Sequence, residues 1–231
     1  MYTIDDKNYL SLIKTNNKDT YDYIMHLIDE YRSDLQKGCH DIRNVLALLV
    51  GNLGLIELTH NDLVSDNRWN QIKEDLNYLV KLMNDITRIH YANVIHKSEF
   101  NYEELLNHIT ASYDLSINVT IDSDISHIIA DKQSIEYILR ALLDNIYECN
   151  SKSEVNIHIY FENNKIYTSV SDNLPEIDKD TQIKLFHLFN TTKQNHSGLN
   201  LATASMIMTA HDGEISYSYN DGNIFCFCFK S

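Results

Sequence analysis

The chain has 231 residues, and its hydrophobic content of 43% supports a sizeable core. The formal net charge of −14 at pH 7 argues against nucleic acid or an anionic membrane as the main partner. Four cysteines, at positions 39, 149, 226 and 228, lack the spacing of a zinc site, and without a recognisable signal peptide they indicate reduced thiols of a cytoplasmic protein. The longest uncharged apolar stretch, residues 45–56, is shorter than the roughly 20 residues that span a bilayer, so no membrane insertion is expected.

The first part of the chain has the pattern of two long helices. A short helix is expected around residues 6–14, followed by long helices over about 19–58 and 69–86 with a polar break between them. Apolar residues recur at spacings of three and four, which predicts one buried seam on each long helix: Leu35, Cys39, Ile42, Leu46, Leu49, Leu53 and Ile56 on the first, and Trp69, Ile72, Leu76, Leu79, Met83 and Ile86 on the second. Two long helices joined by a short polar break predict a helical hairpin. Further apolar residues at 45, 48 and 55 predict that two hairpins pair into a homodimeric four-helix bundle.

His40 lies on the first long helix, away from the apolar seam. At about 100° per residue it is roughly 160° from Ile42 around the helix axis, so its imidazole is expected to face solvent. A neutral imidazole is a good nucleophile toward phosphorus. The adjacent Asp41 is placed to hold the ring tautomer, and Asn44, one turn later, to orient a water or a carboxylate. The alternative is an ordinary surface histidine on a solvated helix face.

After about residue 97 the periodicity changes to alternating helices and strands. Helices are expected at 100–109, 134–149, 181–189 and 199–211, and strands at 117–121, 155–161, 165–171, 214–219 and 223–229. Turn residues at 162–164 and 220–222 join two of the strand pairs. This order predicts a two-layer α+β sandwich with helices on one face of a mixed sheet. The expected fold is therefore a helical dimerisation domain, residues 1–97, followed by an α/β sandwich domain, residues 98–231.

Five short motifs, in this order along the chain, resemble those of the catalytic core of two-component sensor histidine kinases. Residues 40–46 resemble the phosphoacceptor box, 142–148 the asparagine box, 170–173 the start of the first glycine box, 185–193 the phenylalanine box and lid, and 197–201 the second glycine box. Asp131 stands where an aspartate often precedes the asparagine-box helix. The resemblance covers roughly residues 20–231. It implies a dimerising hairpin that carries a phosphoacceptor histidine, then an ATP-binding domain of the gyrase, Hsp90, kinase and MutL type, with a response-regulator receiver domain as partner.

The resemblance also implies roles for individual residues. Asn44 would act in phosphatase chemistry. In an ATP-dependent kinase, Asn145 would hold Mg²⁺ against the ATP phosphates, and Asp172 would accept a hydrogen bond from the adenine amino group. The remaining residues expected to bind the nucleotide belong to the lid and the second glycine box, whose backbone would cradle phosphates at a helix N-terminus: Lys193, Ser197, Gly198 and Leu199.

The glycine boxes depart from the family pattern. Leu174 and Glu176 stand where the first box normally has glycines, and Pro175 lies between them. A leucine side chain would fill the pocket, a carboxylate would oppose the triphosphate, and proline would stiffen the loop. His196 and Asn200 also occupy positions that are usually glycine. These departures argue against ATP-driven autophosphorylation.

An altered ATP-binding domain beside a complete phosphoacceptor box resembles the sporulation phosphorelay phosphotransferase family, which keeps the dimeric histidine bundle and has lost nucleotide use. The residues that carry this likeness are His40, Asp41, Asn44, Leu46, Leu48, Gly51, Asn52, Leu53 and Leu55. The sequence therefore favours a histidine phosphotransferase that exchanges phosphoryl groups with receiver aspartates. The alternatives are an active kinase that autophosphorylates His40 from Mg-ATP, and a non-enzymatic pseudokinase scaffold that binds response regulators.

Overall fold

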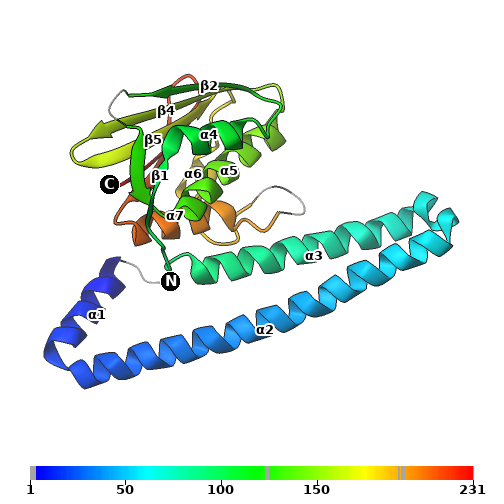
Figure 1. Cartoon of the computed structure of the whole chain (residues 1–231), viewed down its shortest axis with the longest axis horizontal. Helices are drawn as coiled ribbons and strands as arrows, with labels where there is room; N and C mark the ends of the chain where they lie inside the picture. The colour runs from blue at the N-terminus through cyan, green and yellow to red at the C-terminus, as the bar shows by residue number, and fades with distance from the viewer. Residues whose placement is uncertain (1–3, 123–124, 192, 194–195, 231) are drawn as a thin grey trace. The chain divides into compact units, whose positions relative to one another are not determined.

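The computed structural model describes residues 4–122, 125–191, 193 and 196–230. The chain divides into two compact units, of which the first ends at His90 and the second begins at Tyr91. Figure 1 shows the elements of both units along the chain.

The first unit is helical. It contains α1 (Ile4–Asn16), α2 (Lys18–Thr59), the 3₁₀-helix η1 (Asn61–Ser65) and α3 (Asn67–Tyr91). Asn17 caps the N-terminus of α2, because its side chain accepts a hydrogen bond from the backbone N of Thr20 at 3.1 Å. The Asp66 carboxylate accepts from the backbone N of Arg68 and of Trp69 at the start of α3. The predicted helices and the break between them are thus present.

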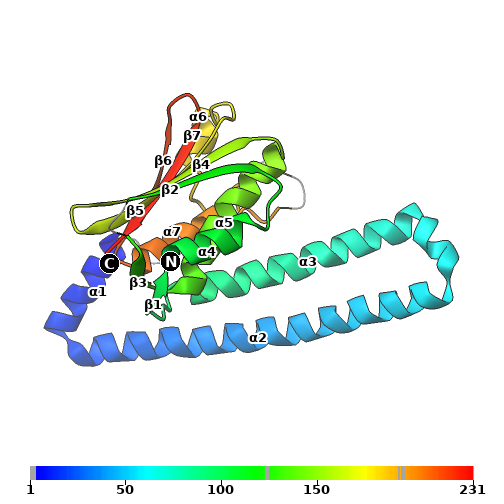
Figure 2. The ribbon, with the colours of Figure 1, turned by 45° about the horizontal axis from the view of Figure 1, so that its top comes forward.

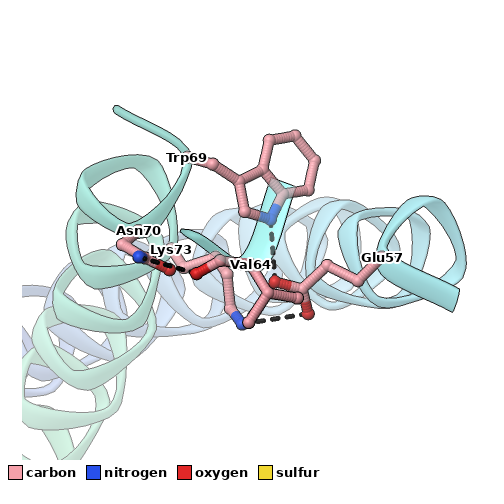
Figure 3. A network of polar contacts seen from close by, with 5 residues as sticks. All are labelled: Glu57, Val64, Trp69, Asn70 and Lys73. Atoms are coloured by element: carbon pink, nitrogen blue, oxygen red, sulfur yellow. Dashed lines mark hydrogen bonds and ion pairs between the residues drawn. The ribbon is translucent and has the colours of Figure 1, made fainter. Parts of the chain in front are cut away.

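Side-chain contacts at two levels hold α2 and α3 as an antiparallel hairpin. Close to the turn, Glu57 accepts hydrogen bonds from Trp69 Nε1 at 2.7 Å and from Lys73 Nζ at 2.7 and 2.9 Å (Figure 3). The bond from Lys73, followed by that from Trp69, lowers the pKa of the Glu57 carboxyl. Further along, Arg43 Nη2 donates to Thr87 Oγ1 at 2.7 Å. These contacts confirm the predicted helical hairpin.

The predicted single buried seam on α2 is wrong in part. Leu46 is buried, but Ile42 and Leu49 are 51% and 46% exposed. The α3 helix covers only one stripe of α2, so many apolar residues that lie outside this stripe remain exposed in the single chain, among them Ile42, Val45, Leu48, Leu49, Leu55, Ile56 and Leu58. The hairpin alone therefore does not bury the apolar surface of α2.

The α2 helix also bears on membrane insertion. By length and composition, a stretch of 18 residues within Lys18–Thr59 is apolar enough to cross a membrane, and little of this stretch is buried in the structure. The apolar part of α2 therefore extends beyond the uncharged residues 45–56, and its length does not exclude a membrane span. The absence of membrane insertion stays a prediction.

The second unit is an α+β sandwich. Its elements are β1 (Ser98–Asn101), α4 (Tyr102–Thr110), β2 (Ser116–Ile121), β3 (His127–Ala130), α5 (Lys132–Cys149), β4 (Glu154–Glu162), β5 (Lys165–Asp172), α6 (Lys179–Ile183), α7 (Asn200–Ala210), β6 (Glu214–Tyr219) and β7 (Asn223–Phe229). The main sheet has the strand order β2-β4-β5-β7-β6, with β2 parallel to β4 and the other pairs antiparallel. The helices α4, α5 and α7 lie on one face of this sheet, as Figure 2 shows. The predicted sandwich with a mixed sheet is confirmed.

Alternating side chains explain why the sheet has one covered face. Val155, Ile157 and Ile159 of β4 are fully buried, whereas the residues between them are exposed. The turn from β4 to β5 is formed by Asn163 and Asn164, whose φ angles of 49° and 63° are tolerated best by asparagine and glycine. Sequence pattern and turn chemistry therefore specify the same strand register.

Two predicted helices differ from the structure. The helix expected at 100–109 begins at Tyr102, because residues 98–101 form β1 and pair with β3. The helix expected at 181–189 is replaced by the shorter α6, which ends at Ile183. Phe189 has φ of 61°, which a right-handed helix cannot include. The segment after α6 therefore leaves the helical conformation.

Candidate functional site

Three residues of α2 form a cluster around one imidazole. The side chain of His40 is 65% exposed and that of Asp41 is 80% exposed. His40 Nδ1 lies 3.4 Å from Asp41 Oδ1 and 3.2 Å from Asn44 Nδ2. Among the residues that the structure describes, no hydrogen bond involves the other ring nitrogen, Nε2. The structure thus brings together the three residues that the sequence singled out, with both contacts at Nδ1.

The two contacts define which nitrogen of His40 can react. A carboxylate only accepts hydrogen bonds, so the contact with Asp41 requires a proton on Nδ1. The Asn44 amide can present either its oxygen or its nitrogen to Nδ1, since the two are exchanged by a rotation of the side chain. With the proton on Nδ1, the lone pair of neutral His40 is on Nε2, which is the nucleophilic atom. The geometry therefore favours reaction at Nε2.

Contacts with α3 hold the His40 segment in place. Three residues after His40, the guanidinium of Arg43 is bound to Thr87, and Thr87 Oγ1 in turn donates to the backbone carbonyl of Met83 at 2.8 Å. Leu46, on the same side of α2, is 7% exposed. The imidazole is thus mounted on a helix whose other side is anchored.

A second group of predicted site residues lies on α5 and on the segment before α7. Asn145 is half-buried on α5, and Glu148 follows it by one helical turn. Lys193 Nζ lies 2.9 Å from Glu148 Oε2, and His196 Nδ1 lies 3.7 Å from the same oxygen. The ammonium group of Lys193 is thus paired with the carboxylate of Glu148, a residue to which the sequence analysis gave no role in the site. Thr192, which belongs to the predicted lid motif, lies outside the described residues.

The start of α7 keeps the glycine geometry of the predicted second glycine box. Gly198 has φ of 64°, and a Cβ at this position would lie 2.7 Å from backbone atoms of Asn190. Ser197 is half-buried, and Leu199, which precedes the helix, is fully buried. Asn200 accepts a hydrogen bond from Tyr137 at 3.2 Å. Only glycine fits at position 198, and the helix start is fixed by packing.

Asp172 lies at the end of β5 and is 8% exposed. Its Oδ1 accepts hydrogen bonds from Leu174 and from both the backbone and the side chain of Asn223. The side chain of Leu174 is half-buried, and that of Glu176 is exposed. Sequence reasoning missed Asn223 because it lies 51 residues further along the chain.

These residues offer Mg-ATP both favourable and unfavourable groups. Asn145 offers an oxygen ligand for a hard cation, and Gly198 leaves room for close backbone approach. However, the carboxylate of Glu148 would repel phosphates beside Asn145, and the Oδ1 of Asp172 already has donors from the chain. No described group of three or more histidine, cysteine, aspartate or glutamate residues is arranged to hold a metal ion.

Residues 130–231 match the model of the histidine kinase-, DNA gyrase B- and HSP90-like ATPase family, and a domain of this type implies ATP binding. The histidine-protein kinase AtoS of Escherichia coli is 22% identical over 185 residues, which cover 76% of this chain and 30% of AtoS. The chain spans from about a fifth to about half of the length of its curated relatives. These similarities support a two-component histidine kinase catalytic core.

Solved structures share the fold. Full-length ShkA in complex with AMPPNP matches with a TM-score of 0.70 and 21% identity, over 87% of this chain and 45% of ShkA. Histidine kinase ThkA in complex with the response regulator TrrA matches with a TM-score of 0.59 and 20% identity, over 95% of this chain and 66% of ThkA. The order of a helical region and an ATPase-like domain is therefore that of known histidine kinases.

Proposed function

From the architecture of a two-component histidine kinase core, we propose that this chain is a histidine phosphotransferase that exchanges phosphoryl groups with receiver aspartates. The observation that carries the proposal is the exposed His40, whose Nδ1 is contacted by Asp41 and Asn44 and whose Nε2 has no hydrogen bond within the described residues. An exposed and rigidly mounted nucleophile is what transfer between two proteins needs.

The transfer can be written atom by atom. The Nε2 lone pair of His40 attacks the phosphorus of a receiver aspartyl phosphate, an N–P bond forms, and the O–P bond breaks to release the aspartate carboxylate. The ring gains positive charge as the bond forms, and Asp41 stabilises the Nδ1–H that it accepts from. The reverse reaction passes the group to a second receiver. No step requires a nucleotide on this chain.

Three features support the proposal that ATP is not the phosphodonor. Glu148 puts a carboxylate next to Lys193, one turn after Asn145. Asp172 accepts hydrogen bonds from Asn223. Leu174 and Glu176 stand in the loop that follows Asp172, where a bulky side chain and a negative charge oppose a triphosphate.

We further propose that the chain acts as a homodimer. Exposed apolar residues of α2, among them Val45, Leu48 and Leu55, would form the contact between two hairpins. A contiguous apolar surface of this kind marks an interaction site in a water-soluble protein. At about 100° per residue, His40 lies about 140° from Val45 but only about 80° from Leu48 around the helix. The proposed dimer therefore has to leave the imidazole, which is 65% exposed in the single chain, accessible beside the helix contact.

An active cytoplasmic kinase is the second candidate. It is favoured by the family match over residues 130–231 and by the retained left-handed conformation of Gly198. A scaffold without catalysis is the third, but it gives no reason for Asp41 and Asn44 to surround the imidazole of His40.

Two labelling reactions separate these functions. The purified chain is incubated with Mg²⁺ and radiolabelled ATP, and separately with a receiver domain phosphorylated on its aspartate. We expect acid-labile label on the chain only in the second reaction. Label from ATP would establish the kinase. No label in either reaction, with the receiver still bound, would leave the scaffold.

A further inference from the structure

The end of β5 carries a buried polar network that the phosphotransfer reaction does not use. Asp172 is 8% exposed and Asn223, the first residue of β7, is 3% exposed. Asp172 Oδ1 accepts hydrogen bonds from the backbone N of Leu174 at 2.9 Å, the backbone N of Asn223 at 3.2 Å and the side-chain Nδ2 of Asn223 at 2.9 Å. A carboxylate oxygen offers about two lone-pair directions, so this oxygen is saturated by donors from the chain itself.

The amide of Asn223 is also fully engaged. Besides Asp172, its Nδ2 donates to the carbonyl of Pro175 at 3.1 Å. Its Oδ1 accepts from the hydroxyl of Tyr217 on β6 at 2.8 Å, and that hydroxyl accepts from the backbone N of Ile177 at 3.3 Å. One side chain thus connects the end of β5, the loop 173–177 and the strand β6.

The turn between β6 and β7 is shaped to allow this connection. A Cβ at Gly222 would lie 1.8 Å from the carbonyl oxygen of Asp172, so no other residue fits at this position without a shift of the backbone. Because Gly222 lets the turn pack directly onto the end of β5, the next residue, Asn223, reaches the Asp172 carboxylate. Breaking this contact would leave a buried carboxylate and a buried amide each short of a hydrogen-bond partner, which costs part of their desolvation.

We propose that Asn223 is an internal ligand of Asp172. The resemblance to kinases gives Asp172 the role of accepting a hydrogen bond from the adenine amino group, and the Asn223 amide is a chemically equivalent N–H donor. Asn223 therefore takes the place of the base at this carboxylate and fastens the loop 173–177 to β7 without nucleotide. This inference rests on the proposed function, because it explains how an ATPase-like domain remains ordered at this loop when it does not use ATP.

A double-mutant cycle tests the pair. Asn223→Ala and Asp172→Ala are each expected to lower the Tm by about 4 °C or more, since each removes a hydrogen-bond partner from a buried polar group. The double variant is expected to lose no more than the larger single loss, because the two residues act through one contact. Asn118→Ala, on the exposed face of β2, is the matched control and should leave the Tm nearly unchanged. Single variants with an unchanged Tm, or losses that simply add, would overturn the proposal.

A second measurement follows the amide directly. The side-chain NH₂ signals of Asn223 are assigned by NMR through their loss in Asn223→Ala, and the wild-type chain is titrated with Mg-ADP. We expect these signals to stay in place. A saturable shift of the Asn223 signals would mean that nucleotide displaces the amide, and would reject an internal ligand.

A second variant of Asp172 and a separate measurement of phosphoryl transfer complete the experiment. If Asp172→Ala does not fold, Asp172→Asn keeps the shape and takes its place in the cycle, again with coupled losses expected. Phosphoryl transfer to His40 is measured separately. Coupled Tm losses in a chain that fails to accept phosphoryl groups would reject the phosphotransfer function and leave the role of Asn223 intact.

Discussion

The amide of Asn44 lies 3.2 Å from Nδ1 of His40, the same ring nitrogen that faces Asp41. The amide can therefore compete with the carboxylate for this atom. When the amide nitrogen donates to Nδ1, the proton is shifted to Nε2, and the ring can no longer attack phosphorus there. When the amide oxygen faces Nδ1, both neighbours support the reactive tautomer. The orientation of Asn44 thus bears directly on the reactivity of His40.

The first prediction concerns His40 itself. His40→Ala should abolish acid-labile labelling from a phosphorylated receiver while the fold is retained, because an exposed side chain contributes little to stability. Labelling is measured by autoradiography and folding by circular dichroism. His26→Ala is the control, since His26 is an exposed histidine on the same helix. Label that persists in His40→Ala would show that another residue is the nucleophile.

The neighbours of His40 should have separable effects. Asp41→Asn removes the acceptor that holds the Nδ1 proton and should slow transfer by roughly 10²–10⁴-fold. Asn44→Ala removes the amide that can compete with Asp41 for Nδ1, so transfer should change less than in Asp41→Asn, and the larger effect is expected on the rate at which phosphorylated His40 is hydrolysed. Rapid-quench kinetics measure both rates. An equal loss of transfer and hydrolysis in both variants would mean that the two residues only stabilise the helix.

The proposed dimer gives a third prediction. Leu48→Glu should convert the chain to a monomer at micromolar concentration, because burying an unpaired carboxylate in the helix contact costs several kcal/mol. Leu53 is less suitable, since it is half-buried in the single chain and its substitution would disturb the hairpin. Light scattering after gel filtration measures the mass. Ile129→Glu, at a half-exposed position on β3, should leave the mass unchanged. A wild-type chain that is already monomeric would reject the dimer.

Two glycines should respond in opposite directions to the same substitution. Gly198→Ala should destabilise the folded chain by at least about 1–3 kcal/mol, because φ at this position is positive and a Cβ would lie 2.7 Å from the backbone of Asn190. Gly51→Ala should stabilise by about 0.5–1 kcal/mol, since Gly51 is inside α2 and a Cβ there meets no atom within 4 Å. Urea denaturation measures both. A stabilising Gly198→Ala would contradict the close approach of these two segments.

The sequence predicts local features well and long-range pairs poorly. His40, Asp41 and Asn44 lie within one helical turn, so helix geometry alone brings them together. The Asn163–Asn164 turn likewise follows from local chemistry. By contrast, the pair of Asp172 and Asn223 is separated by 51 residues and forms only when β7 pairs with β5.

Short or interrupted helices and strands also cannot be predicted from the periodicity of the sequence. The strands β1 and β3 have four residues each, which is too short to show an alternation. The apolar residues around Phe186 and Phe189 have helical spacing, but the left-handed φ of Phe189 ends any helix. Packing across the domain decides these conformations, and one sequence window does not contain that information.

The last prediction is a loss of stability in acid that depends on His211. This residue follows α7 and is fully buried. Its Nδ1 lies 2.9 Å from the carbonyl of Ile207, and its Nε2 accepts from the backbone N of Asp131 at 3.2 Å. These two contacts require a neutral ring with the proton on Nδ1. A second proton would break the contact with Asp131, which also caps α5.

Burial is the main reason why the pKa of His211 is lowered from its usual value of 6.5, and the nearby Lys97 acts in the same direction. The carbonyl of Ile207 and the carboxylates of Asp131 and Asp212 oppose this shift without cancelling it. Because the folded chain binds the proton less readily than the unfolded chain, His211 favours folding fully above pH 6.5, and stability is lost as the pH falls below that value. Between pH 7.5 and 5.5 the loss from one such group is at most about 1.4 kcal/mol.

Urea denaturation at several pH values measures this effect as the slope of the unfolding free energy against pH. His211→Gln cannot be protonated in this range, so its slope between pH 7.5 and 5.5 should be shallower than that of the wild-type chain, although it is less stable at pH 7.5. His26→Asn, at an exposed position on α2, is the control and should keep the wild-type slope. All other ionisable groups are common to the wild-type chain and His211→Gln, so the difference in slope is assigned to the histidine. An identical slope in His211→Gln would mean that His211 is protonated equally in the folded and unfolded chains.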